Sequence, residues 1–200
     1  GHQKAGYGDP CIVGDSESPR MIITSCSGTP GFFSGTRDHH QGWARWYSND
    51  NGATWSEPQY IDEEFVYSKF DKSAYGPIRG WFIGSGKICQ STKTKVNKYR
   101  RLYLVGSSCR QGSNETANWV LYSDDFGETW EFLGGCDVSP MPNGDEPKAE
   151  ELPDGSVLLS SRCNGGRRFN IFTFTDTKKA EGSWGEVAFS GQSNNGVTAL

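Results

Sequence analysis

The sequence predicts an all-β protein, and three observations support this fold class. Glycine and aromatic residues are frequent: the 200 residues include 26 glycines and seven tryptophans, and 13% are Phe, Trp or Tyr. Short strand-like runs alternate with clusters of Gly, Asn, Asp and Ser, which is typical of strands joined by turns. No long segment shows the period of an amphipathic helix. The length suits one domain, which we expect to span residues 1–200.

The first strands and turns are indicated by a pattern, S-x-D-x-G-x-T-W, that occurs twice. The copies are Ser48–Trp55 and Ser123–Trp130. Each follows a strand-like run with aromatic residues, Gly42–Tyr47 in one case and Asn118–Tyr122 in the other. Each copy is therefore predicted to be the turn of a hairpin. A third, degenerate copy with altered spacing lies at Thr175–Trp184.

The residue types of the repeat fit a structural turn. Ser and Asp side chains can accept hydrogen bonds from turn amides, Gly adopts a φ that other residues avoid, and Trp can pack the turn onto a sheet. Because Asp50 and Asp125 are each needed to satisfy their own turn, we expect neither to be catalytic.

These turns resemble the Asp-box, or BNR, repeats of sialidases, which join the outer strands of propeller blades. The resemblance implies a β-propeller of four-stranded antiparallel blades, six in the family, of which this chain covers only about three to four. The spacing of the two copies suits one blade plus an inserted loop, which we expect at Gln59–Arg79. Asp9-Pro10 resembles the Asp-Pro that opens a blade in this family.

The segment Gly144–Arg162 carries the candidate chemistry. It resembles the sialidase stretch in which a catalytic Glu-Pro is followed by a strand, a Glu-Leu-x-Asp-Gly turn and a second strand that ends in a catalytic Arg. A tight turn at Pro153–Gly155 makes the two strands antiparallel, so Glu146 and Arg162 should return to the same end of the sheet. We expect Glu150 and Glu151 on a solvated face or in the turn.

The resemblance implies an exo-α-sialidase that removes terminal sialic acid from glycoproteins, glycolipids and oligosaccharides. Sialic acid carries a carboxylate at its anomeric carbon, and Arg162 matches one of three arginines that hold it with parallel hydrogen bonds. This charge disfavours a carboxylate nucleophile, and the family uses a tyrosine, which forms a covalent intermediate with retention. Glu146 matches the glutamate that accepts the proton of that tyrosine. Arg37 and Asp38, on a loop before the first Asp-box, are expected to contact hydroxyl or acetamido groups of the sugar.

Other classes of partner and site are disfavoured. The net charge is −4 with a pI near 5.4, and the basic residues are scattered, so we expect no nucleic acid partner. No apolar run approaches the roughly 20 residues of a membrane helix. His39-His40 lacks a third ligand at a suitable spacing, so a solvated or substrate-facing loop is expected there, with no metal and no cofactor. The cysteines show no CxxC pair, and disulfides stay open; they are Cys11, Cys26, Cys89, Cys109, Cys136 and Cys163.

Several alternatives stay open. In sialidases the site also needs an early Arg, an Asp acid/base, a third Arg and the Tyr nucleophile, and this sequence identifies none of them. We therefore expect an incomplete site, and the activity of the segment alone is an open question. A non-catalytic Asp-box propeller that binds glycan or protein is the main alternative. Glu146 and Arg162 could form only a salt bridge, and a glycosidase with two carboxylates would need a second acid. The resemblance implies a secreted, periplasmic or cell-surface location.

Overall fold

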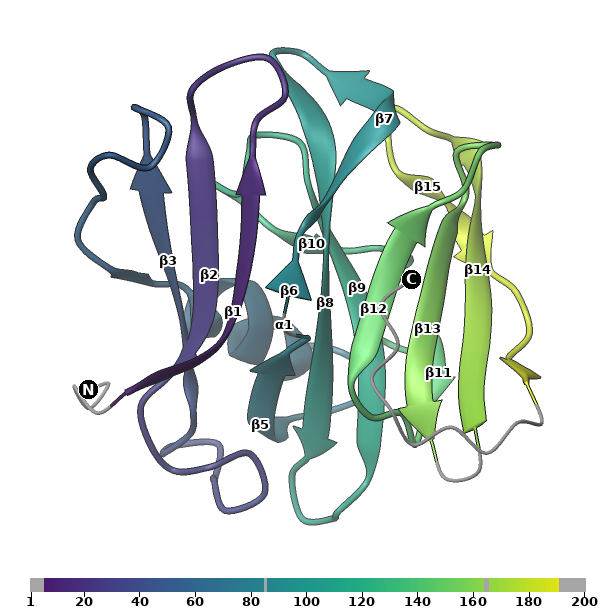
Figure 1. Cartoon of the computed structure of the whole chain (residues 1–200). Coiled ribbons are helices and arrows are strands. Elements are labelled where there is room, and N and C mark those ends of the chain that lie inside the picture. Colours follow the sequence, from purple (N-terminus) through teal and green to yellow (C-terminus); the bar gives the residue numbers. More distant parts are fainter. Residues whose placement is uncertain (1–5, 85, 164–165, 191–200) are drawn as a thin grey trace.

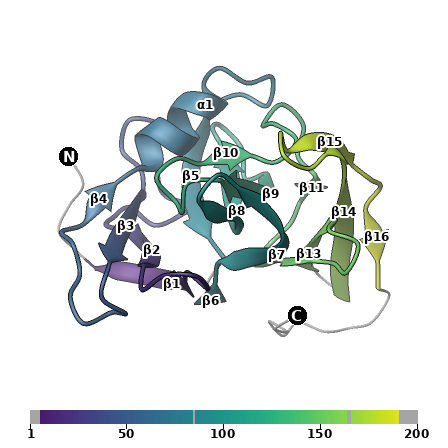
Figure 2. The same ribbon diagram turned by 90° about the horizontal axis from the view of Figure 1, so that it is seen from above.

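The computed structural model describes residues 6–84, 86–163 and 166–190. Over these residues it is an all-β structure of three sheets that follow one another along the chain (Figure 1), so the predicted fold class is confirmed. Seen from above, β1, β6 and β7 lie together, whereas β4, β10 and β15 lie apart from one another, at the left, in the upper middle and at the upper right (Figure 2). The sheets therefore fan out from one side of the molecule.

The first sheet has the strand order β4-β3-β2-β1, with all neighbours antiparallel. A two-residue strand from the following segment, β6, pairs with β1 in parallel. Their bounds are β1 Tyr7–Gly14, β2 Met21–Ser27, β3 Gly42–Ser48, β4 Gln59–Tyr60 and β6 Gly86–Lys87.

The second sheet is the largest and has the antiparallel order β10-β9-β8-β5, with β7 added on β8 and β11 on β9. Its long central strand β8 connects directly to β9, whose end carries the second Asp-box turn. The bounds are β5 Ile78–Ile83, β7 Cys89–Val96, β8 Tyr99–Arg110, β9 Thr116–Ser123, β10 Glu131–Phe132 and β11 Met141–Pro142.

The third sheet has the antiparallel order β12-β13-β14-β15, and β16 pairs with β14. Its first two strands are the pair that the Glu-Pro to Arg segment predicts, with a tight turn between them. The bounds are β12 Pro147–Glu151, β13 Val157–Cys163, β14 Gly166–Asp176, β15 Glu181–Trp184 and β16 Ala188–Phe189.

The connection from β4 to β5 is helical where the sequence predicts an inserted loop. It contains a π-helix, η1 (Glu63–Tyr67), and one short α-helix, α1 (Ser68–Phe70). The segment packs Phe65, Val66, Tyr67 and Phe70 into the core. Two short consecutive helices show too little periodicity to be recognised in a sequence, because an amphipathic pattern needs several turns. No helix of the described residues is long and apolar enough to cross a membrane.

Large aromatic side chains fill the interfaces between the sheets. Trp43, Trp81, Trp119 and Trp130 are all buried in one core cluster, between the first and second sheets and the helical segment. A second cluster joins the second and third sheets and includes Tyr103, Val157, Leu159 and Phe172. Packing between the sheets therefore holds them in place, because each fully buried apolar side chain contributes about 1.5–3 kcal/mol.

All six cysteines are free thiols, and no disulfide links the described residues. Cys11 and Cys26 lie on the neighbouring strands β1 and β2, where burial raises the pKa of each thiol to about 12. These thiols therefore act as small apolar side chains in the core, because the reactive thiolate is disfavoured there.

Candidate functional site

The hairpin of β12 and β13 brings Glu146 and Arg162 together. Pro147 pairs with Ser161, and the backbone amide of Arg162 donates to the carbonyl of Glu146 at 3.4 Å. In the connecting turn, Asp154 accepts hydrogen bonds from the amide and the hydroxyl of Ser156, at 3.0 and 2.6 Å. The prediction that Glu146 and Arg162 return to the same end of the sheet is therefore confirmed.

The side chains of Glu146 and Arg162 form an ion pair. Nη1 of Arg162 donates to Oε2 of Glu146 at 3.0 Å, which confirms the predicted proximity. Sequence reasoning missed a third member, Asp145. Nε and Nη2 of Arg162 donate to Oδ2 of Asp145 at 3.0 and 2.6 Å. The only sequence signal for Asp145 is its position directly before the candidate glutamate.

The donor count of Arg162 leaves room for a ligand. A guanidinium carries one hydrogen on Nε and two on each terminal nitrogen. Asp145 takes the Nε hydrogen and one of Nη2, and Glu146 takes one of Nη1. One hydrogen on each terminal nitrogen remains. Such a terminal pair can hold one further carboxylate, and the Arg162 side chain is partly exposed.

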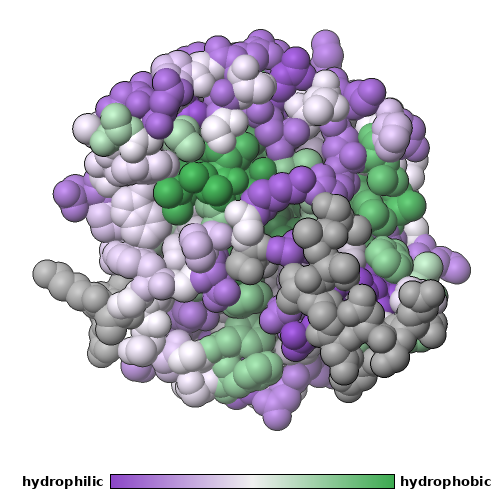
Figure 3. Space-filling view, viewed as in Figure 1, coloured by the Kyte–Doolittle hydropathy of each residue, from purple (hydrophilic) through white to green (hydrophobic). Residues whose placement is uncertain are grey.

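Asp145, Glu146 and Arg162 line one wall of an open hollow of about 780 Å³. Three aromatic side chains also line the hollow, Phe32, Phe33 and Phe82. Figure 3, which is viewed as in Figure 1, shows an apolar area near the lower end of the molecule. β12 begins and β13 ends at this lower end (Figure 1). The volume lies within the range of small-molecule sites, so the hollow suits a ligand with an anionic and an apolar side.

A second arginine lies beside this wall and was also missed. Arg167 on β14 is the cross-strand partner of Arg162, and its buried side chain donates from Nε to Oγ of Ser160 at 2.8 Å. Its terminal nitrogens are buried and have no hydrogen-bond partner in the described part of the chain. Burial lowers the pKa of Arg167, and the charge of Glu146 acts in the opposite direction. The region around Glu146 is thus richer in positive charge than the sequence motif indicates.

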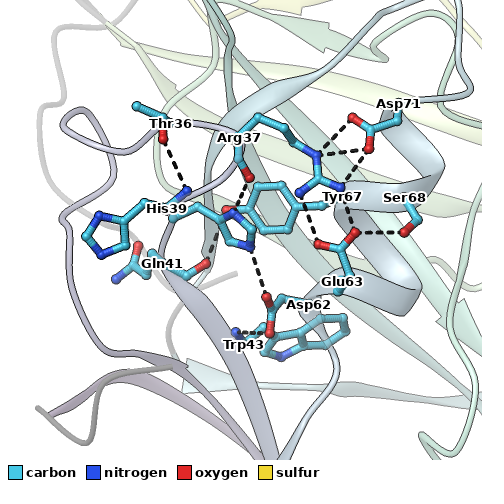
Figure 4. A network of polar contacts seen from close by, with 11 residues as sticks. Thr36, Arg37, His39, Gln41, Trp43, Asp62, Glu63, Tyr67, Ser68 and Asp71 are labelled. Atoms are coloured by element: carbon cyan, nitrogen blue, oxygen red, sulfur yellow. Dashed lines mark hydrogen bonds and ion pairs between the residues drawn. The ribbon is translucent and has the colours of Figure 1, made fainter. Parts of the chain in front are cut away.

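Arg37 and Asp38 do not line this hollow. Arg37 forms ion pairs with Glu63 and Asp71 of the helical connection (Figure 4). Asp38 is exposed and makes no hydrogen bond or ion pair within residues 6–84, 86–163 and 166–190. Their contact with the sugar stays a prediction, and no contact in the hollow supports it. Trp43, which follows this loop at the start of β3, is buried in the core.

The expectation of a solvated loop is wrong for His40. Its Nδ1 donates to the carbonyl of Arg37 at 2.7 Å, and its Nε2 lies 3.2 Å from Oδ2 of the buried Asp62. The ring stacks on Tyr67 with 3.6 Å between the ring centroids. His39 is exposed, as expected for a loop. The long-range partner Asp62 could not be inferred from sequence spacing.

The solvated face expected for Glu150 and Glu151 is also wrong. Glu151 accepts hydrogen bonds from the amides of Thr92 and Lys93, at 2.7 and 3.2 Å, in the bulge of β7. Glu150 forms an ion pair with Lys87. Glu151 therefore joins the third sheet to β7 of the second, because the bulge leaves amides without strand partners. Glu150 joins the third sheet to β6, which pairs with the first sheet.

Two segments of the chain match the model of the BNR/Asp-box repeat, residues 46–57 and 121–132. Among curated proteins, the chain is 33% identical over 120 residues to a sialidase of Paraclostridium sordellii, which covers 60% of this chain and 27% of that protein. It is 28% identical over 134 residues to sialidase-3 of Rattus norvegicus, which covers 64% of this chain and 30% of that protein.

The fold resembles the solved structure of Hadza microbial sialidase Hz136, with a TM-score of 0.68 at 18% identity over 92% of this chain and 33% of that chain. The resemblance to sialidases that the motifs predict is thus confirmed in sequence and in fold. The chain spans less than a third of the length of the two curated relatives, at 27% and 30%.

Proposed function

We propose that this chain, similar to sialidases in repeats, sequence and fold, is the central part of the catalytic propeller of an exo-α-sialidase. Its three sheets would be consecutive blades of a six-bladed propeller. The observation that carries the proposal is the ion pair of Glu146 and Arg162 in the wall of an open hollow. Fold similarity alone does not establish an activity, so the argument depends on this site.

In this proposal Arg162 holds the carboxylate of sialic acid. The two hydrogens left on its terminal nitrogens point to a bidentate contact, which a planar guanidinium makes with a carboxylate. Asp145 keeps the guanidinium oriented by holding Nε. The buried charge of Arg167 adds to the positive potential behind the ligand.

Glu146 acts as the proton acceptor for the tyrosine nucleophile of the family. A phenol has a pKa of about 10 and is a weak nucleophile near neutral pH, so it needs a base within hydrogen-bond reach. The tyrosine oxygen attacks the anomeric carbon and gives its proton to Glu146, while the glycosidic bond breaks and the acid/base Asp of the family protonates the leaving sugar oxygen. Water then gives a proton to that Asp and cleaves the tyrosyl bond, the tyrosine takes its proton back from Glu146, and sialic acid leaves with retained configuration. Residues that complete this step are not identified in the sequence.

A non-catalytic role is the second candidate, and one observation favours it. Arg162 is paired with two carboxylates, Asp145 and Glu146, so the group carries a net negative charge. A net negative group attracts an anionic sugar poorly. In a binding module this cluster would only tie the start of β12 to the end of β13.

The proposed substrates are sialylated glycoproteins, glycolipids and oligosaccharides, and the proposed location is secreted, periplasmic or at the cell surface. The proposed substrates follow from the sialidase names of the relatives, whereas the proposed location rests on the family resemblance of the sequence motifs alone.

Kinetics of the complete protein with Glu146→Gln and Arg162→Lys test the proposal. Glu146→Gln should lower turnover about 10²- to 10⁴-fold and leave binding of sialic acid nearly unchanged. Arg162→Lys keeps the positive charge but loses the two parallel hydrogen bonds of the guanidinium, and should weaken the binding of sialic acid by about 1–3 kcal/mol. Residues outside the lining of the hollow provide matched controls: Glu131→Gln, and Arg100→Lys at the opposite end of β8. Wild-type turnover in Glu146→Gln would leave the ion pair with a structural role only.

A further inference from the structure

Two of the three phenylalanines that line the hollow, Phe32 and Phe33, lie on the loop of residues 28–41, between β2 and β3. Phe33 is 59% exposed, and its ring packs edge-on against Phe32 at 4.8 Å. Phe32 in turn contacts Phe82 of β5 at 6.2 Å. Since Phe33 is mostly in water, burial of its own ring contributes little to holding the loop in this position.

The inner side of the loop lies directly on the sheet. Gly35 is buried, and a Cβ at this position would overlap with the carbonyl oxygen of Arg79. Thr36 and His39 form a short bridge at the loop tip, with backbone hydrogen bonds of 2.8 and 3.2 Å. These two hydrogen bonds lie within the loop itself, as does the bond from the amide of Ser34 to the carbonyl of Gly31 at 3.0 Å. At the end of the loop, Oη of Tyr67 donates to the carbonyl of Gln41 at 3.1 Å.

The outer side of the loop is held by Arg37. Its Nε donates to both oxygens of Asp71 at 3.0 and 2.9 Å, and its Nη1 donates to Glu63 at 3.0 Å. Nη2 bonds to both carboxylates, at 2.6 and 2.7 Å (Figure 4). The guanidinium also lies 5.4 Å from the centre of the Tyr67 ring. All three nitrogens are thus committed to the helical connection, and the bond from Arg37 lowers the pKa of Glu63.

His40 adds a second attachment at the base of the loop. Because a carbonyl oxygen only accepts, Nδ1 of His40 carries the proton in its bond to the carbonyl of Arg37. The other ring nitrogen faces the buried Asp62, which also accepts from the amide of Trp43 at 3.2 Å. His40 therefore binds the backbone of Arg37, while Glu63 and Asp71 bind its side chain.

We propose that Arg37 is a positioning residue that holds the loop on the helical connection, so that Phe32 and Phe33 form a fixed apolar part of the hollow that Arg162 also lines. A single exposed ion pair stabilises weakly, but one guanidinium shared by two carboxylates with this geometry is a stronger attachment. This role needs no direct contact of Arg37 with a sugar. Its consequence for ligand binding rests on the proposed function, whereas the attachment of the loop does not.

The test compares Arg37→Gln with Arg37→Lys and with the control Arg110→Gln, whose pair with Glu115 is exposed and 3.5 Å long. Chymotrypsin cleavage after Phe32 and Phe33, and hydrogen exchange at the amides of Thr36 and His39, report on local opening. Arg37→Gln should raise both rates about 10-fold, Arg37→Lys should lie between it and wild type, and the control should change neither. Amides of β13 should exchange as in wild type.

Unchanged cleavage and exchange in Arg37→Gln would overturn the proposal, as would an equal increase in β13, which would indicate general destabilisation. If Arg37→Gln does not fold, Glu63→Gln removes one of the two attachments and should open the loop by a smaller factor.

Kinetics of the complete protein on a sialoside add a readout that a general structural role would not produce. KM should rise severalfold in Arg37→Gln while kcat stays close to wild type, with partial recovery in Arg37→Lys. A lower kcat at unchanged KM would contradict the positioning role. A wild-type protein with no sialosidase activity would contradict the proposed function, and the exchange experiment would still decide on the loop.

Discussion

The two Asp-box turns have the same internal hydrogen bonds and different surroundings. In both, the Thr amide donates to the Asp carboxylate at 2.9 Å and the Thr hydroxyl at 2.6 Å. In both, the Gly amide donates to the Ser hydroxyl, at 2.8 Å in the first turn and 2.7 Å in the second. The expectation that each aspartate binds amides of its own turn is confirmed.

The tryptophans that end the turns differ. Trp55 is 36% exposed and its Nε1 donates to the carbonyl of Gly52 at 3.0 Å. Trp130 is fully buried, 5.8 Å from the ring of Trp43 in the first sheet. Arg45 of that sheet also donates to the carbonyls of Gly127 and Glu128. The same eight-residue pattern thus forms the same turn, while contact with a neighbouring sheet decides how much the turn stabilises the fold.

Replacement of the tryptophans should give the largest difference in stability between the two Asp-box turns. Trp130→Ala leaves a cavity in a closed core and should lower the free energy of unfolding by about 3–5 kcal/mol. Trp55→Ala should lower it by only about 1–2 kcal/mol, because part of its ring is already in water. Urea unfolding followed by circular dichroism measures both. Equal losses would show that Trp55 is covered in solution.

Replacement of the turn glycines should give the next largest difference. Gly52 and Gly127 have φ of 86° and 83°, so an alanine is strained at both by about 1–2 kcal/mol. At Gly52 the new Cβ would lie 3.4 Å from Sδ of Met21, but at Gly127 it would overlap with Cδ1 of Ile22. We expect a loss of about 2–4 kcal/mol for Gly127→Ala, since overpacking adds to the strain.

Ile22→Val provides the control, because it removes the overlapping atom. It should recover about 1 kcal/mol in the Gly127→Ala background and nothing in the Gly52→Ala background. Recovery in both backgrounds would mean that the overlap is not the cause.

Replacement of the aspartates should abolish the difference between the turns. Asp50→Ala and Asp125→Ala each remove hydrogen bonds to a charged acceptor, so both should lower the melting temperature by the same amount within error. Glu186→Ala, at an exposed position, is the control. Thermal unfolding measures the loss, and turnover of the complete protein should not change. Loss of turnover at an unchanged melting temperature would show that an aspartate takes part in chemistry.

Of all these changes, acidification should have the smallest effect on stability, and this effect arises in the first turn. Bonds from the side chain and the amide of Thr54 lower the pKa of Asp50 to about 2. An unfolded aspartate has a pKa of about 3.9, so this carboxylate stabilises the folded state above pH 4 and loses that contribution as the pH falls towards 2. The stability difference between wild type and Asp50→Asn should therefore shrink over this interval. A constant difference would contradict the assignment.

The parts that the sequence predicts well are those that local contacts determine. Each Asp-box network closes within eight residues, and a tight turn suffices to bring Glu146 to Arg162. The role of Asp145 depends on a side-chain rotamer at a strand end, which a sequence motif does not specify. The ion-pair partners of Arg37 could not be predicted for another reason. Glu63 and Asp71 lie 26 and 34 residues further along, in and directly after helices too short to show a period.

Glu151 illustrates the same limit over a longer separation. Its hydrogen-bond partners lie 58 to 60 residues earlier, in the bulge of β7. A bulge disrupts the alternation of inward and outward side chains along a strand. The sequence therefore does not indicate that unpaired amides in this bulge bind a carboxylate.

The parallel pairing of β6 with β1 has a consequence for the order of folding. Most strands of each sheet come from one continuous segment, so a sheet can form soon after its own segment leaves the ribosome. The inner edge of the first sheet is the exception, because its partner, Gly86–Lys87, is synthesised after β5 of the second sheet. Until then β1 exposes unpaired amides, so a nascent chain that has been synthesised only as far as β5 is prone to edge-to-edge association.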